Sequence, residues 1–292
     1  MLFHISRESR LHMAESTLPR DTADQVARGN LLYAEQQRKA RRFRRNVGAS
    51  WGILLLILIF LFSGQNILGI GTIQLDIEWM RENISFIALG IPETLKVSAW
   101  SIVLAMVLAL LAALGRLSTI PPVYALSTFY VSLIRGTPLY LQIFFFFLAL
   151  PQIGIILPGF WAGVLALGLN YGAYMSEIFR AGLASVSRGQ REAAVAIGMT
   201  PRQTLQRIVL PQALRFAIPP IGNDFIAMTK DSALVAGTGF VHEIMWRATR
   251  VGRATFHSLE ALIIAAIFYW MITLILTYIQ SIIEARLAKG DR

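Results

Sequence analysis

The sequence contains no cysteine among its 292 residues, which excludes disulfide bonds, thiolate metal ligands and cysteine nucleophiles. Charge is also scarce: only 15% of the residues are charged, 55% are hydrophobic, and the mean hydropathy is +0.56. A soluble protein of this length needs more polar surface. The composition therefore predicts a membrane protein, and redox chemistry is not expected of it.

A phosphate-binding loop of the form Gly-x-x-x-x-Gly-Lys-Ser/Thr is lacking as well, so the chain is not expected to bind ATP or to be an enzyme. Its four histidines do not have the spacing of metal ligands, and we expect no metal site. What the sequence does have is long apolar stretches and a formal charge of +10. In a membrane protein such an excess usually marks basic cytoplasmic segments.

Stretches without charge predict six membrane-spanning helices. The first lies between Arg45 and Asp76 and is apolar from Trp51 to Phe62. The others are expected within 96–116, 121–150, 160–180, 213–237 and 261–283. Proline should break two of them, the third at Arg135-Gly136-Thr137-Pro138 and the fifth at Pro219-Pro220.

Six bases immediately before the first span set the predicted orientation: Arg38, Lys39, Arg41, Arg42, Arg44 and Arg45. The positive-inside bias places them in the cytoplasm, and six spans bring the C-terminus to the same side. An outer loop with Arg247, Arg250 and Arg253 runs against this bias. The predicted parts are a cytoplasmic basic tail (1–46), an additional transmembrane helix (47–75), an extracytoplasmic interfacial segment (76–92), a core (93–286) and a cytoplasmic C-terminal tail (287–292).

The basic tail has mixed charge and no long apolar run, which predicts a solvated or partly helical extension. Binding of anionic lipid headgroups by its basic end is the alternative. Nucleic-acid binding is not expected, because no aromatic residues alternate with the bases and no folded domain presents them.

The cytoplasmic loop at 187–211 carries two helix-capping patterns. Ser187 followed by Gln190 should open a short helix that ends at Gly198. Thr200-Pro201 with Gln203 should open a second helix, which Pro211 is expected to end.

The spacing of this loop resembles the EAA loop of ABC-importer permeases, at Glu192, Ala193, Ala194, Gly198, Ile208, Leu210 and Pro211. In that family the loop is a coupling helix that docks in a groove on the ATPase subunit, so the resemblance implies that these seven residues couple the chain to an ATPase. An ordinary helical hairpin between spans and a DNA-binding helix-turn-helix are the alternatives.

Three further segments are similar to permeases of polar amino-acid importers of the histidine, glutamine and arginine type: Arg135–Leu139, Tyr174–Gly182 and Lys230–Val235. The resemblance implies an all-α polytopic membrane protein, with a five-span ABC-importer permease core plus one additional N-terminal transmembrane helix. The implied function is that of the permease subunit of an ATP-binding-cassette importer in the bacterial inner membrane, carrying a polar amino acid or a close analogue into the cytoplasm.

The partners that this resemblance implies are an ATPase dimer, a second permease chain (identical or paralogous), an extracytoplasmic substrate-binding protein and membrane lipid. ATP and Mg would be bound by the ATPase, and no cofactor by this chain. The alternative is a secondary transporter driven by an ion gradient, whose marks would be an inverted repeat and an acidic ion relay. No convincing repeat relates the halves of this sequence.

Polar residues inside the spans are candidates for the solute pathway. Arg135 and Thr137 lie at the first proline break, and Asn223 and Asp224 follow the second. We predict that these four residues line a cavity near the bilayer midplane. The alternative for Arg135 is a purely structural ion pair with Glu177, Asp224 or Asp231. Gly168 and Gly172 predict a close contact between helices.

Overall fold

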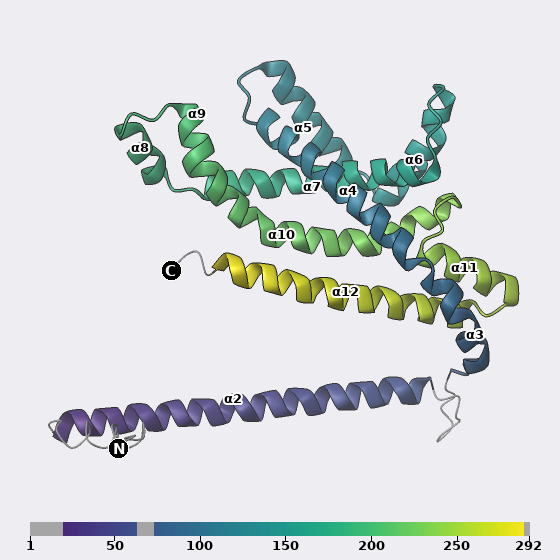
Figure 1. The fold of residues 1–292 in the computed structure, drawn as a ribbon, viewed down its shortest axis with the longest axis horizontal. Coiled ribbons are helices and arrows are strands. Elements are labelled where there is room, and N and C mark those ends of the chain that lie inside the picture. The colour runs from purple at the N-terminus through teal and green to yellow at the C-terminus, as the bar shows by residue number, and fades with distance from the viewer. Residues whose placement is uncertain (1–19, 63–72, 289–292) are drawn as a thin grey trace, which may run out of the picture. The chain divides into compact units, whose positions relative to one another are not determined.

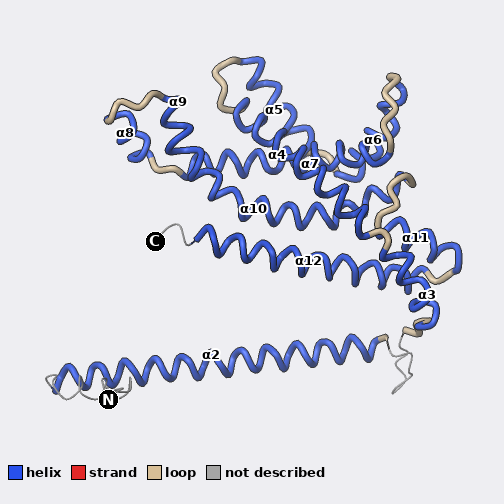
Figure 2. Tube along the Cα trace, viewed as in Figure 1, coloured by secondary structure: helices blue, strands red, loops and turns tan. Residues whose placement is uncertain are grey.

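The computed structural model describes residues 20–62 and 73–288, and within these ranges it is helical with no strand (Figure 2). The chain divides into two compact units, which are Met1–Leu75 and Asp76–Arg292. The predicted tail residues 1–19 and the end of the predicted first span at 63–72 lie outside the described residues, as do residues 289–292.

In the first unit, helix α2 runs from Arg20 to Leu61 without a break across the expected boundary at residue 46. No proline interrupts these 42 residues, and Ala, Gln, Arg and Leu favour helix along most of them. The side chains from Leu31 to Leu61 are exposed. The basic end of the tail and the first predicted span are therefore parts of one helix.

The second unit consists of helices of unequal length (Figure 1). They are α3 (Ile77–Ala88), α4 (Ile91–Gly115), α5 (Pro121–Arg135), α6 (Leu139–Gln152), α7 (Gly159–Ser185), α8 (Arg188–Ala196), α9 (Pro201–Thr204), a π-helical segment η1 (Leu205–Val209), α10 (Leu210–Asp231), a 3₁₀ segment η2 (Ser232–Thr238), α11 (Ile244–Thr255) and α12 (Ser258–Ala288). Helix α7 lies at the centre, where it contacts α4, α5, α6 and α10, whereas α12 packs on α3, α10 and α11.

The contact between α4 and α7 requires two glycines. A Cβ atom added at Gly168 would lie 2.6 Å from Leu104 Cδ2, and one added at Gly172 would lie 2.9 Å from Leu108 Cβ. The facing side of α4 is built from small buried residues such as Ala105. The close helix packing predicted from Gly168 and Gly172 is confirmed, and it brings the two helix backbones together.

Three described stretches are long and apolar enough to cross a membrane: Leu31–Leu61, Ile77–Gly115 and Ser258–Leu287. A fourth results if α5 and α6 together form one span. Helices α7 and α10 occupy the predicted fourth and fifth spans but are less apolar. Sixteen residues of α7 are buried inside the unit, including polar Asn170 and Ser176, so this helix does not need the apolar surface of a lipid-facing one.

The predicted break of the third span is confirmed, because α5 and α6 meet at an angle of 110°. The predicted break of the fifth span at Pro219-Pro220 is wrong, since α10 continues through both prolines. Proline has a helical φ, so a helix can pass through it at the cost of the hydrogen bond to the carbonyl four residues earlier. Gln280 Nε2 of α12 donates to the Pro219 carbonyl at 3.2 Å, which connects this part of α10 to α12. The segment with Arg247, Arg250 and Arg253, predicted to be an outer loop, contains helix α11.

Candidate functional site

The loop expected to contact an ATPase begins with the short helix α8. The Ser187 hydroxyl accepts a hydrogen bond from the Gln190 amide at 3.4 Å, which caps the helix. At the other end Gly198 has φ +81°, a left-handed conformation that side chains resist. Its amide donates to the Val195 carbonyl at 2.9 Å, and the Met199 amide donates to the Ala194 carbonyl at 3.0 Å. The predicted helix and its glycine turn are both present.

The second helix of the loop begins as expected but does not end as expected. Thr200 and Gln203 form the reciprocal capping box, with distances of 2.9 and 3.3 Å. The prediction that Pro211 ends this helix is wrong. The five-residue π segment η1 leads directly into α10, with the Leu210 amide donating to the Leu205 carbonyl. The wider π turn makes room for a proline ring that would clash with the preceding turn of an α-helix.

The exposed surface of α8 combines charge with apolar side chains. Glu192 is exposed and lies 3.7 Å from Arg188 in a pair one helical turn apart. Val195 and Ile197 are 64% and 77% exposed, an arrangement typical of a surface that a partner covers. Ala194 instead is buried against the body of the loop. All residues of α8 except Ala194 are exposed, so the helix and its C-cap Ile197 present both charged and apolar side chains outward.

The remaining residues of the EAA pattern divide between surface and interior. Ala193, Gly198 and Pro211 are exposed, whereas Ile208 and Leu210 are half-buried. At the base of the loop four buried side chains form a small core: Leu183, Val186, Val209 and Ala213. A cleft of about 330 Å³ beside this core reaches from Leu117 to α8 and α9.

Arg135, at the end of α5, is held in an ionic cluster on α7. Its Nη1 lies 3.2 Å from Glu177 Oε1, and its guanidinium is 5.2 Å from the centre of the Tyr174 ring. Arg116 Nη1 and Arg180 Nε contact the same carboxylate at 2.6 and 2.7 Å. Three guanidinium groups therefore share one carboxylate, so the cluster carries an excess of positive charge.

Thr137 belongs to a second polar cluster, which connects the bend between α5 and α6 to α7. The buried side chain of Gln142 donates from Nε2 to the Ile134 carbonyl at 2.8 Å, to the Thr137 carbonyl at 3.0 Å and to Thr137 Oγ1 at 2.8 Å. Gln142 Oε1 accepts from Asn170 Nδ2 at 3.0 Å. These bonds satisfy carbonyls that the broken helix leaves without amide donors.

Asn223 and Asp224 lie on α10 and have different surroundings. Asn223 Oδ1 accepts from Gln280 Nε2 at 3.1 Å. Asp224 is half-buried, and its Oδ2 is enclosed without a hydrogen-bond partner. Seven residues further along the same helix, Asp231 Oδ2 accepts from the Tyr171 hydroxyl at 2.8 Å. Among the described residues, no hydrogen bond or ion pair connects Arg135 or Thr137 with Asn223 or Asp224.

Sequence reasoning missed Gln142, Asn170 and Gln280, the amides that bind the irregular or proline-containing segments. A signal was available for Gln142, which is the one strongly polar side chain in the apolar run from Leu139 to Leu150. Its partners could not be predicted, because Asn170 lies 28 residues further along the chain.

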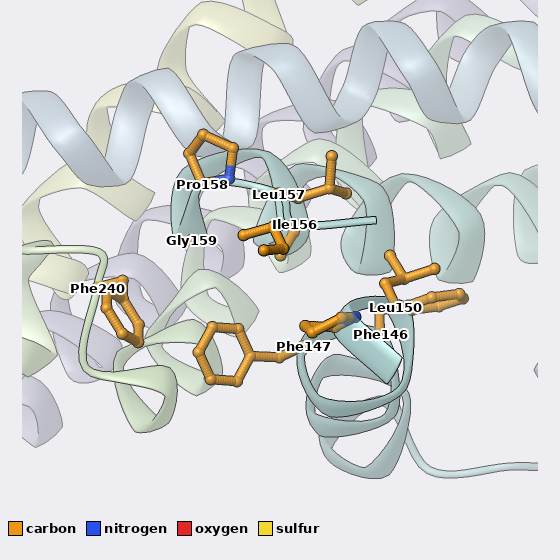
Figure 3. Close-up of a pocket in the computed structure, with 10 residues that line it drawn as sticks. Phe146, Phe147, Leu150, Ile156, Leu157, Pro158, Gly159 and Phe240 are labelled. Atoms are coloured by element: carbon orange, nitrogen blue, oxygen red, sulfur yellow. The ribbon is translucent and has the colours of Figure 1, made fainter. Parts of the chain in front are cut away.

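A pocket of about 400 Å³ lies where α6 turns into α7, around Phe147, Pro158 and Phe240 (Figure 3). All ten of its lining residues are apolar or glycine. It therefore offers no side-chain partner for a charged or polar solute. In the described part of the chain no three His, Asp or Glu side chains form a possible metal site.

A buried carboxyl group lies outside the spanning helices, at Glu243. It caps α11 by accepting from the Trp246 amide at 2.6 Å, and it also accepts from the hydroxyls of Tyr269 and, at 3.5 Å, Thr94. Burial raises the pKa of Glu243, and these hydrogen bonds offset part of that rise. The group joins α4, α11 and α12.

Residues 102–289 match the family described as binding-protein-dependent transport system inner membrane component. The chain belongs to this family. The permease is 40% identical over 219 residues to the arginine transport system permease protein ArtQ of Bacillus subtilis (strain 168), covering 75% of this chain and 100% of that one. It is 42% identical over 201 residues to the L-cystine transport system permease protein TcyB of the same organism, covering 68% and 86%.

The fold agrees with this assignment. A chain of the structure titled "Crystal structure of an amino acid ABC transporter with histidines" is 35% identical and covers 73% of the permease and 99% of itself, with a TM-score of 0.69. A chain of the MetNI methionine ABC transporter, at 15% identity and a TM-score of 0.55, shares the fold alone. The expected class, an all-α polytopic ABC-importer permease subunit of the inner membrane, is confirmed over the secondary transporter.

Proposed function

We propose that this permease carries a polar amino acid or a close analogue into the cytoplasm. Its relatives are named for arginine, L-cystine and glutamine transport, and the family is described as dependent on a binding protein. In this proposal a binding protein delivers the substrate on the outer side, and a second permease chain completes the pathway. An ATPase dimer binds ATP and Mg, while this chain binds no nucleotide or cofactor.

The observation that carries the proposal is the exposed face of α8, within a loop that has the EAA spacing. Glu192 supplies a charge and Val195 and Ile197 supply apolar contact, a combination suited to a groove on another protein. Gly198 sets the direction of α8 relative to α9 through its left-handed backbone. Because α9 continues through η1 into α10, a displacement of α8 by the ATPase would be passed to the polar residues of α10.

The solute pathway belongs to the same proposal. Arg135, Thr137 and Asn223 have internal partners, so their contribution would be to shape and charge the cavity. Asp224 differs from them because one of its carboxylate oxygens is enclosed without a partner. An unpaired carboxylate is costly to bury, and a cationic group of the substrate would relieve that cost. Asp224 is therefore the residue of the four that we assign to substrate contact.

The coupling role is tested by Gly198→Val and Glu192→Arg, each expressed together with the ATPase subunit of the proposed importer. Valine at a positive φ costs about 1–3 kcal/mol, so we expect α8 to leave its docking direction and ATPase co-purification to fall about tenfold. Glu192→Arg should have a similar effect by reversing a charge at the interface. Both variants should still insert into the membrane.

The matched control is Gly189→Val on the same helix. A Cβ atom at Gly189 has no atom within 4 Å, and its φ is not positive, so this variant should retain the ATPase. Normal co-purification and normal transport in both Gly198→Val and Glu192→Arg would contradict the coupling role.

A further inference from the structure

Helix α2 is not explained by the function of the family. It ends at Leu61, before the family match begins at residue 102. The permease ArtQ of Bacillus subtilis is matched over 100% of its length by 219 residues of this chain. The function that ArtQ is named for therefore does not require this helix, and its surface is free to serve another partner.

The cytoplasm-facing end of the predicted span carries a dense group of bases, which we call the basic collar: Arg38, Lys39, Arg41, Arg42, Arg44 and Arg45. Their side chains are exposed. Lys39 pairs with Glu35 at 2.8 Å, and the five arginines form no ion pair within the described part of the chain. No acidic residue lies between positions 36 and 45.

The collar covers more than half of the helix circumference instead of following one side of it. At about 100° per residue, the six bases are spread over about 220° of the circumference. A docked protein or a nucleic-acid groove contacts one face of a helix. A partner that meets bases on most sides of a helix at the same depth is a layer of headgroups around it.

The apolar part of α2 places the collar at that depth. The exposed apolar run begins at Trp51 and continues to Leu61, and Arg45 precedes it by roughly 9 Å along the axis. The collar itself is roughly 10 Å long, comparable to the interfacial layer of a bilayer, which is about 5–8 Å thick. Flexible arginine side chains cover the difference.

We propose that the basic collar of α2 binds the headgroups of anionic phospholipids and collects these lipids around the permease. The chemistry is that of guanidinium groups with phosphodiester oxygens, strengthened because the five arginines have no acidic partner within the described residues. Such binding keeps α2 at a fixed depth in the membrane. It does not depend on the proposed substrate or on the side of the membrane at which the collar lies.

The test uses the absence of cysteine, which makes a single dye site possible in the full-length protein. Ala40→Cys places a donor dye in the collar without changing its charge. The protein is reconstituted in phosphatidylcholine bilayers with a minor fraction of either phosphatidylglycerol or phosphatidylcholine that carries an acceptor on its acyl chain. We expect energy transfer to favour phosphatidylglycerol at least about threefold, and the preference to disappear as salt is raised from about 0.05 to about 0.5 M.

Replacing Arg38, Arg41, Arg42 and Arg45 by glutamine should reduce the preference to about one. A dye at Ser85→Cys on α3, in the other unit, is the matched control and should show no preference. An equal response to the two lipids in the unmodified collar would overturn the proposal, as would a preference that survives high salt or the four glutamines. A preference for phosphatidylglycerol that appears only after the ATPase is added would show that the collar binds the ATPase instead of lipid, and would also overturn the proposal.

Discussion

At the scale of single residues, the four polar residues predicted to line the pathway differ in whether another part of the chain binds them. The sequence left open whether Arg135 serves the pathway or an ion pair, and the structure pairs it with Glu177. Asn223 is bonded to Gln280, 57 residues away, which no local pattern indicates. Asp224 alone of the four predicted pathway residues keeps an enclosed oxygen without a partner. The sequence predicts where polar groups lie along the spans, but residues distant in the sequence decide which of these groups are hydrogen-bonded.

Replacing Asp224 by asparagine tests whether this carboxylate contacts the substrate. The change keeps the size of the side chain and removes its charge, so we expect transport of cationic amino acids to fall about tenfold more than transport of neutral ones. The measurement is uptake of several amino acids by purified complex in liposomes, normalised to folded protein. Unchanged relative rates would contradict substrate contact, because a purely structural carboxylate affects all substrates alike.

Replacing Glu243 by glutamine tests the buried carboxyl group that joins α4, α11 and α12. Because the folded state raises the pKa of Glu243, it holds the proton more tightly than the unfolded state does. The group's contribution to stability is then complete below the unfolded pKa and is lost as pH rises through the folded pKa. Glutamine stays neutral and keeps an acceptor for the Trp246 amide.

The measurement is thermal unfolding of both proteins in detergent between about pH 4 and pH 9. We expect the Tm of Glu243→Gln to exceed that of the unmodified protein at high pH and the difference to shrink at low pH. A difference that stays constant over this range would show that folding does not raise the pKa of Glu243.

At the scale of helices, local sequence signals predicted where a helix begins better than how far it continues. The caps at Ser187 and Thr200 and the glycine turn at Gly198 require only neighbouring residues, and all three are present. The passage of α10 through Pro211 follows a π turn, and beside Pro219-Pro220 a side chain of α12 bonds to the backbone of α10; local sequence predicts neither contact. The bend of α5 and α6 likewise depends on contacts from α7. Proline shows where a helix can break, and the surrounding packing decides whether it does.

Replacing Gln142 by leucine tests the cluster that binds the α5–α6 bend. The variant leaves the Ile134 and Thr137 carbonyls and the Asn170 amide without their shared partner, which should cost about 1–3 kcal/mol of unfolding free energy. The matched control is Gln152→Leu on the same helix. Gln152 is exposed, and its side chain is bonded only to the Leu148 carbonyl at 3.3 Å. Gln152→Leu should therefore lower the unfolding free energy by no more than about 0.5 kcal/mol. Equal costs for the two variants would show that the cluster does not stabilise the bend.

At the scale of the whole molecule, composition was enough to place the chain in a membrane but not to define every span. Helices α4 and α12 lie in stretches with a clear hydropathy signal, whereas α7 does not, because it is enclosed by its neighbours and carries glycine and polar residues. The family match confirms an inner-membrane component. Orientation was predicted from the bases before Trp51, and it remains a prediction with both termini in the cytoplasm.

Orientation can be measured with an impermeant thiol reagent on intact cells, for which the cysteine-free protein is an unlabelled blank. Cysteine placed at Ala34, before the first span, should be protected until the membrane is opened. Cysteine placed at Ser85 on α3, which is exposed and predicted to be extracytoplasmic, should react at once. The opposite pattern would reverse the orientation, and labelling of both positions would mean that an even number of spans, or none, separates Ala34 from Ser85.

The uninterrupted run from α9 through η1 to the end of α10 has a mechanical consequence. At 1.5 Å per residue, the run from Pro201 to Asp231 has a contour length of roughly 45 Å, and it changes direction between α9 and α10 (Figure 1). A tilt of about 5° about its α9 end would therefore move Asp231 by at most roughly 4 Å, about the length of a hydrogen bond. A break in the helix at Pro211 would have absorbed such a rotation. In the proposed complex the coupling also works in reverse, because a solute that shifts α10 would change how tightly the ATPase binds α8.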